Sequence, residues 1–178
     1  MTVHSFALNP YRNWSLALIT AASLSLLALA AVQISRPTAT ASSTVVQTAN
    51  EADLVTRSNH ERQAVYLSTL TWDERLYEAA RSKAKHMLAQ QYFDHVSPTG
   101  VTPWSFIRAA GYSYDSAGEN LAVGFTKNEQ VVQAWMNSPT HRANILDPDF
   151  TEIAIAEAHG TLRGEGVTVV VQMFGEPE

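Results

Sequence analysis

The chain has 178 residues, the length of one domain with room for an additional segment. With 46% hydrophobic and 16% charged residues it has the composition of a globular protein, and its net charge of −5 argues against broad attraction to nucleic acid or to an anionic membrane surface. The lack of cysteine excludes a disulfide framework, a thiolate nucleophile and a cysteine-based zinc site.

The first feature along the chain is an uncharged apolar run from Trp14 to Ile34. Because about 20 apolar residues can cross a bilayer as a helix, we predict that residues 1–34 form a hydrophobic helix that is a signal anchor or a signal peptide. The run exceeds the usual length of a signal-peptide core, which favours the anchor, whereas Ala-x-Ala patterns at 28–30 and 39–41 would allow cleavage. A buried helix of the folded domain is a weaker alternative, because the neighbouring segments show no amphipathic partner pattern.

Both favoured interpretations place the rest of the chain outside the cytoplasm, either anchored to the membrane or secreted. Residues 35–50 are rich in Ser, Thr and Ala and lack periodic apolar residues, which predicts a flexible linker. Helical spacing begins at Glu51, and we therefore assign residues 51–178 to one folded domain.

Helical patterns dominate the first half of this domain. A first helix is predicted from Glu51, and a second helix is predicted to start at 70–73, with Thr71 as N-cap and Glu74 completing a capping box. A short helix is predicted at 103–111, with Pro in its first turn and Gly at its end. The apolar stripe of the second helix has six members: Leu76, Ala79, Ala80, Lys83, Ala84 and Met87.

Strand patterns dominate the second half. The run at 117–125 is predicted to be the first strand, and a helix is predicted at 128–137. Strands are predicted at 151–157 and 167–174, with a hairpin loop at 160–166 between them. Helices followed by strands, with one helix between the strands, indicate the α+β class.

Three polar side chains are candidates for a functional site. His95 follows the second helix, Glu119 lies in an otherwise apolar strand segment, and His141 follows Ser138-Pro139. Each histidine has a structural interpretation as a cap or a partner of backbone groups, whereas a carboxylate at Glu119 must reach solvent or find partners. If the three converge, two imidazoles and a carboxylate form a three-ligand site with room for water, which suits zinc or another divalent metal.

The segments around these residues, taken together, resemble the CAP (SCP/PR-1) superfamily, in particular its cysteine-free bacterial branch. The resemblance covers about Leu54 to Gly175 and rests on three motifs: Phe93-Asp94-His95, Gly118-Glu119-Asn120-Leu121-Ala122 and the run from Trp135 to Leu146. It implies a three-layer α-β-α sandwich with a central antiparallel sheet. It also implies a buried polar clamp at Asn59 and Arg62, which would otherwise be a solvated pair.

The family pattern is matched only in part. His95 and Glu119 correspond to a histidine and a glutamate of the cleft in this superfamily, whereas the second histidine of the eukaryotic branch is replaced by Asp149 and the second glutamate by Ser138. His141 belongs instead to a motif similar to the bacterial branch, and whether its ring faces the cleft does not follow from the resemblance.

The resemblance implies an extracytoplasmic, non-enzymatic protein that binds a ligand, a partner or a divalent metal in a cleft lined by His95, Glu119 and His141. Its partner would be a small molecule, a lipid or a component of the cell envelope, with membrane contact through the N-terminal segment and no nucleic acid. The main alternative is a metal-assisted hydrolase of peptide, lipid or cell-wall material, with Glu119 as general base or ligand. A structural module with a vestigial cleft is a third hypothesis.

Two other enzyme classes are weaker hypotheses. Ser97 or Ser138 could join His95 and Glu119 in a Ser-His-acid triad, but no G-x-S-x-G turn presents either serine. A glycosidase pair of Glu119 with Asp94 or Asp149 depends on a carboxylate separation that the sequence does not give.

Overall fold

The computed structural model describes residues 7–8 and 48–178. Apart from Ala7–Leu8, the predicted signal or anchor segment lies outside the described residues, as does nearly all of the predicted linker. Among the described residues, none of the helices combines the length and the apolar character needed to cross a bilayer. The mixed α+β class predicted from the sequence is confirmed.

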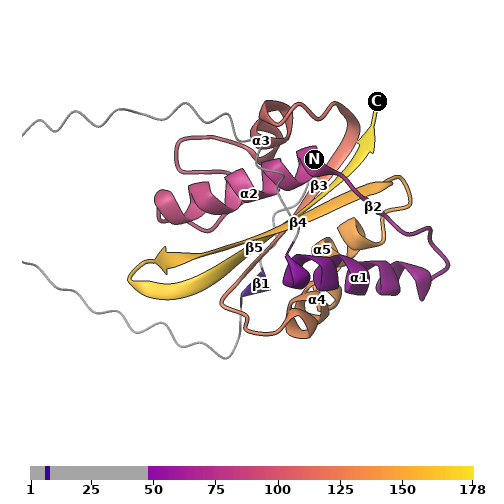
Figure 1. Cartoon of the computed structure of the whole chain (residues 1–178), viewed down its shortest axis with the longest axis horizontal. Coiled ribbons are helices and arrows are strands. Elements are labelled where there is room, and N and C mark those ends of the chain that lie inside the picture. Colours follow the sequence, from indigo (N-terminus) through magenta and orange to yellow (C-terminus); the bar gives the residue numbers. More distant parts are fainter. Residues whose placement is uncertain (1–6, 9–47) are drawn as a thin grey trace, which may run out of the picture. The chain divides into compact units, whose positions relative to one another are not determined.

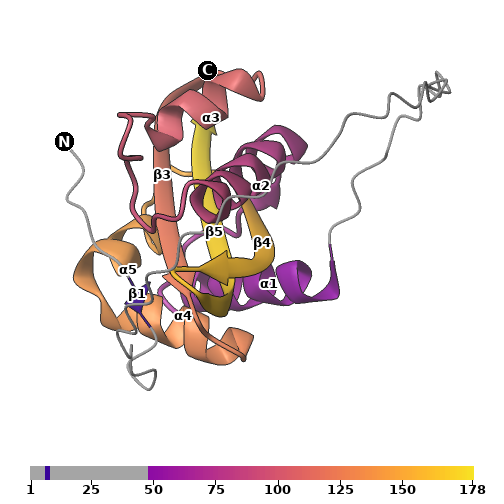
Figure 2. The ribbon, with the colours of Figure 1, turned by 90° about the vertical axis from the view of Figure 1, so that its left-hand side faces the viewer.

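The described strands form one sheet in the order β1-β3-β5-β4-β2. Its centre consists of β3 (Tyr114–Val123), β5 (Glu165–Pro177) and β4 (Glu152–Leu162), which lie side by side and antiparallel, as predicted (Figure 2). The two edge strands were not predicted. β1 (Ala7–Leu8) pairs in parallel with β3, and β2 (Thr71–Trp72) pairs in parallel with β4. The register of β3 against β5 shifts once, between Tyr114 and Ser116.

The β4–β5 hairpin is longer than the sequence predicted. The expected loop at 160–166 is mostly strand, and the chain turns at Arg163 and Gly164, whose φ angles of 52° and 85° suit a two-residue turn. Gly160 lies within the ladder, where space is short: a Cβ there would stand 3.0 Å from a methyl carbon of Leu88. The glycines were therefore mistaken for loop residues, although at least one of them marks close approach of a helix to a strand.

Helix α2 (Glu74–Ala89) covers one face of this sheet, and α3 (Pro103–Ala109) packs against α2 (Figure 1). The predicted N-cap, Thr71, is wrong: its backbone pairs with β4, and the carboxylate of Asp73 caps α2 instead. The predicted stripe of α2 is confirmed as buried. Its alanines allow close approach to β4, which contributes alanines of its own at 154, 156 and 158.

Helices α1 (Ala49–Gln63), α4 (Asn128–Asn137) and α5 (Pro139–Ile145) lie on the opposite side of the sheet (Figure 1). The bounds of α4 are those predicted. Helix α5 was not predicted, because Ser138-Pro139 was interpreted as a helix end, whereas proline also suits the first turn of a new helix. The large apolar side chains of this face form one core: Leu54, Leu70, Trp135, Ile145, Phe150, Ile153, Ile155 and Phe174.

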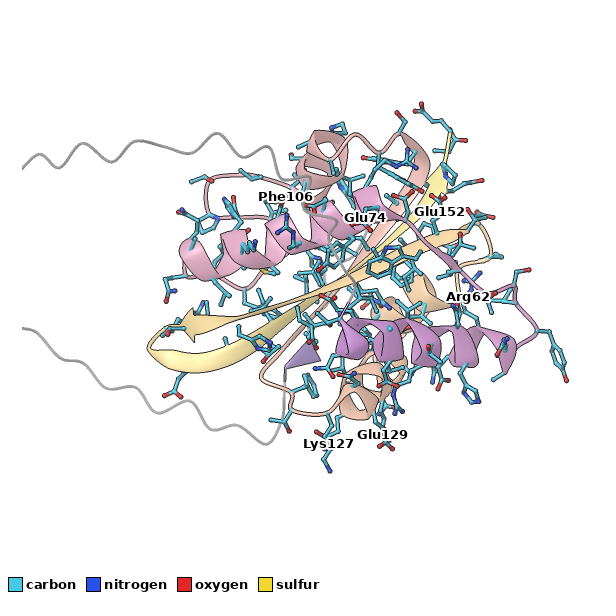
Figure 3. All side chains as sticks on the ribbon, viewed as in Figure 1. Arg62, Glu74, Phe106, Lys127, Glu129 and Glu152 are labelled. Atoms are coloured by element: carbon cyan, nitrogen blue, oxygen red, sulfur yellow. The ribbon has the colours of Figure 1, made fainter. Side chains whose placement is uncertain are left out.

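Arg62 joins α1 to the segment after α5. Its side chain is buried, and the guanidinium donates hydrogen bonds to four backbone carbonyl oxygens, those of Ser68, Ile145, Asp147 and Phe150, at 2.6–3.2 Å (Figure 3). Asn59 exchanges two hydrogen bonds with the backbone of Leu70. The polar clamp implied by the family resemblance is confirmed, with Arg62 buried and Asn59 half-buried.

Candidate functional site

His95 and Glu119 form a close pair beneath α2. His95 lies in the loop after α2 and Glu119 lies in β3; His95 Nδ1 and Glu119 Oε1 are 2.6 Å apart. When the carboxylate is ionised it can only accept, and Nδ1 then donates the proton of this hydrogen bond. The His95 side chain is 12% exposed and that of Glu119 is 1% exposed. The structure thus brings together two of the three residues that the sequence singled out.

The Glu119 carboxyl is buried next to side chains that can carry charge. Burial raises its pKa above the ordinary value, whereas the hydrogen bond from His95 and the charges of Lys83 and His95 oppose that shift. Oε2, the second oxygen, accepts no hydrogen bond from any residue that the structure describes. The ionised form of this buried acid is therefore stabilised by His95 and by the nearby cation.

That cation, Lys83, is a residue of the site that sequence reasoning missed. It was assigned to the apolar stripe of α2, and it is indeed fully buried there. Its ammonium group donates to the backbone carbonyl oxygens of Asp94 and His95. The available signal was the lysine itself, because a buried lysine requires hydrogen-bond partners and an apolar stripe does not supply them.

The other face of β3 carries a chain of neutral side chains. Asn120 donates to the backbone oxygen of His141 at 3.1 Å and to Gln172 Oε1 at 2.9 Å. Asn144 donates to Asn120 Oδ1 at 2.8 Å, and Gln172 Nε2 donates to Ser58 Oγ at 2.9 Å. This amide chain, defined as Asn144, Asn120, Gln172 and Ser58, runs along one face of the sheet from α5 to α1. The Asn of the Gly-Glu-Asn motif is therefore a structural residue.

His141 lies in α5 and is buried. Its backbone carbonyl contacts Asn120, and successive side chains of a strand point to opposite faces. The main chain of His141 is therefore on the opposite face of the sheet from the Glu119 carboxylate. Within residues 7–8 and 48–178, no three His, Asp or Glu side chains are grouped so that they could hold a metal ion. The zinc arrangement with His95, Glu119 and His141 thus lacks a donor set there, and metal binding stays a prediction.

The Ser97 hydroxyl stabilises the turn in which Ser97 lies. It accepts the N–H of Val101 at 2.9 Å and is hydrogen-bonded to Thr99 at 3.0 Å, while the Gly100 N–H donates to the backbone oxygen of Ser97. These contacts are those of a turn-stabilising serine and give no support to a Ser-His-acid triad.

A hollow of about 350 Å³ lies at the hairpin end of the sheet. It contains one histidine, His159, whose Nδ1 is hydrogen-bonded to Thr168 at 2.8 Å. Its lining does not include His95 or Glu119, and consists of Gly124, Phe125, Thr126, His159, Gly160, Gly166, Val167 and Thr168.

Comparison with known proteins gives a consistent family match. The model of the family described as CAP, Cysteine-rich secretory protein family, matches residues 55–174. The uncharacterized protein YkwD of Bacillus subtilis is 47% identical over 107 residues, which are 60% of this chain and 42% of YkwD. The chain therefore spans less than half of the length of that relative.

Solved structures share the fold. An outer surface protein from Borrelia burgdorferi has a TM-score of 0.67 at 24% identity, over 75% of this chain and 97% of its own. An extracellular protein containing an SCP domain, from Bacillus anthracis, has a TM-score of 0.63 at 26% identity, over 80% of this chain and 45% of its own.

Proposed function

The chain belongs to the CAP family of cysteine-rich secretory proteins, and we propose that it is an extracytoplasmic CAP-domain protein that binds a ligand at His95 without transforming it. The ligand class is a small molecule, a lipid or a component of the cell envelope. The helices on both faces of the sheet support the three-layer α-β-α arrangement that the family resemblance implies.

The 2.6 Å contact between His95 and Glu119 carries this proposal. A buried carboxylate that accepts the Nδ1 proton fixes the tautomer and the orientation of the ring. The ring so oriented is partly exposed, and we propose that the ligand contacts it.

Two observations support the extracytoplasmic location. The uncharged run at 14–34 has the length of a membrane-crossing helix. The Bacillus anthracis relative is described as extracellular and the Borrelia burgdorferi relative as an outer surface protein. Anchoring through the N-terminal segment is part of the proposal.

Binding is preferred to metal-assisted hydrolysis because of the donor set. A catalytic zinc site takes three protein ligands and an open position. Among the described residues, no three His, Asp or Glu side chains are grouped so that they could supply those ligands. Elemental analysis of the purified chain checks this preference: stoichiometric zinc that is lost in His95→Ala would favour the hydrolase instead.

Co-sedimentation tests the proposed function. The purified full-length chain is mixed with isolated peptidoglycan and, separately, with phosphatidylcholine–sterol vesicles. We expect binding to one of these probes, weakened at least tenfold in His95→Gln. His60→Gln, which changes an exposed histidine of α1, is the matched control and should bind like the unmodified chain. Equal binding by His95→Gln and the unmodified chain, or binding to neither probe, would contradict the proposal.

A further inference from the structure

Lys83 is a cation inside an otherwise apolar helix face. It lies in α2 with no exposed surface, among alanines, Leu76 and Met87. Burial lowers the pKa of its ammonium group, and the charges of Glu119 and Asp94 oppose that shift. An apolar side chain of similar length would fill the same volume without having to bury a charge. The ammonium group must therefore be matched by its surroundings.

Each N–H donor of the Lys83 ammonium group has an acceptor close by. An ammonium group has three N–H donors, and three acceptors lie around Nζ: the carbonyl oxygens of Asp94 at 2.8 Å and His95 at 2.5 Å, and the hydroxyl of Tyr92 at 3.3 Å. Two aromatic rings lie close to the cation as well. Nζ is 5.1 Å from the ring centre of Tyr92 and 5.8 Å from that of Phe106, which α3 directs towards α2 (Figure 3).

The positions of the two carbonyls matter more than their number. The carbonyl of Asp94 belongs to the peptide group that precedes the Cα of His95, and the carbonyl of His95 belongs to the peptide group that follows it. Each peptide group is planar. One ammonium group therefore holds both planes that flank a single Cα, which restricts φ and ψ and with them the direction of the Cα–Cβ bond.

The loop needs such an anchor. His95 lies in a segment without helix or strand, between the end of α2 and the start of α3. The segment is tied at Tyr92, whose N–H donates to the backbone oxygen of Met87, and at Ser97, whose N–H donates to the backbone oxygen of Val101. Lys83 holds the middle of the segment, at the residue that has to reach Glu119 in β3.

We propose that Lys83 is a positioning residue of the His95–Glu119 site: by holding the two peptide groups that flank His95, it aims the imidazole at Glu119. It does not itself contact the ligand. This inference deepens the proposed function and rests on it, because the direction of the ring matters to a ligand only if His95 contacts that ligand.

The test observes the His95 ring directly and needs no ligand. In ¹⁵N-histidine-labelled full-length chain at pH 7, the unmodified protein should show one tautomer of His95, protonated at Nδ1, with a low-field proton shared with Glu119. In Lys83→Met, which keeps the length of the side chain and removes the donors, this signal should be lost and the tautomers should mix. Leu76→Ala is the control, since it creates a cavity two turns away in the same helix.

Two outcomes would overturn the inference. The first is an unchanged His95 signal in Lys83→Met. The second is an equal loss of the signal in Leu76→Ala, which would mean that any destabilisation of α2 disturbs the ring. Because these spectra involve no ligand, they decide the role of Lys83 even if the co-sedimentation experiment fails.

A rescue experiment and a measurement on the native chain complete the design. Since the chain has no cysteine, Lys83→Cys creates a unique thiol that can be aminoethylated in the unfolded chain, which restores an ammonium group at nearly the original length. Refolding should recover the His95 signal, whereas a propylated thiol should not. If neither variant folds, the ¹⁵Nζ signal of Lys83 in the unmodified protein decides: slow proton exchange supports the inference, and exchange as fast as in a solvent-exposed lysine refutes it.

Discussion

Glu119 and Asn120 are neighbours in β3, yet their side chains enter two different environments. Glu119 meets His95 and lies near Lys83, and both of these neighbours can carry charge. Asn120 joins the neutral amide chain, in which both of its amide protons and its oxygen have partners. A fully satisfied neutral network fixes geometry, whereas a buried acid that is hydrogen-bonded to an imidazole keeps a capacity for proton and ligand exchange. The Asn120 face is therefore structural, and the proposed function belongs to the Glu119 face.

The largest expected effect is that of Arg62→Met, on the side of the sheet that carries the amide chain. The substitution leaves four backbone carbonyls without their donor, two of them in buried hydrogen bonds, and should lower the free energy of unfolding by about 3–5 kcal/mol. Arg57→Met in the same helix removes only an exposed pair with Asp53 and should lower it by less than about 1 kcal/mol. Urea unfolding at pH 7 measures both. Equal losses of stability in the two variants would contradict a structural role for this side of the sheet.

Asn120→Leu should have the next largest effect. It removes the centre of the amide chain and leaves Asn144 and Gln172 without their shared partner, so we expect a loss of about 2–4 kcal/mol. Asn137→Leu, at an exposed position at the end of α4, should change stability by less than about 0.5 kcal/mol. A loss in Asn120→Leu no larger than in this control would show that the amide chain contributes little to the fold.

Glu119→Gln tests the opposite face of the same strand. Glutamine keeps the shape, and its carbonyl oxygen can still accept the Nδ1 proton of His95, so stability should change by less than about 1 kcal/mol. Binding in the co-sedimentation experiment should nevertheless fall, because a neutral amide holds the ring less firmly than a carboxylate does. If Glu119→Gln destabilises the protein as much as Asn120→Leu does, the side chains on both faces of β3 contribute equally to stability.

The smallest effect is expected at Glu157, a half-buried acid of β4 beside the start of α1. Burial raises its pKa, a hydrogen bond from Asn50 and the charge of His159 oppose the shift, and the charge of Glu51 adds to it. A raised pKa in the folded state means that the contribution of this group to stability is complete below the ordinary value of 4.5 and is lost as the pH rises through the folded-state pKa.

Glu157→Gln should therefore stabilise the protein at pH 7, by less than about 1 kcal/mol. The difference from the unmodified chain should shrink as the pH falls towards 4.5 and below it. Unfolding curves recorded between pH 3.5 and pH 7 check the sign. A variant that is less stable at pH 7 would indicate that the ionised carboxylate supports the start of α1, so that charge has a structural role on this side too.

Much of the fold could be predicted because local patterns reveal faces. The spacing of alanines around Lys83 marked the buried side of α2, and the pattern at 128–137 gave the bounds of α4. The strand at Thr71, by contrast, exists only through pairing with β4, a partner about 80 residues away. Helix α5 was missed because a proline can end one helix or start another, and only packing decides between these outcomes.

The site divides in the same way. The approach of His95 to Glu119 was anticipated from a family resemblance and from the principle that a buried acid needs a partner. Lys83 was placed on the correct face, but its role depends on carbonyls of a loop whose path the sequence does not show. Gln172 and Ser58 were missed because an amide in a strand has many possible partners, and only the register between β3 and β5 selects one.

The irregular pairing between Tyr114 and Ser116 bears on the orientation of the Glu119 side chain. Side chains in a strand alternate, so a slip by one residue would turn Glu119 into the neutral interior and present Asn120 to His95. A bulge upstream of the motif takes up one residue before that alternation reaches Glu119. A single-residue insertion or deletion in the α3–β3 connection can therefore be taken up at Asp115 without turning the Glu119 side chain away from His95.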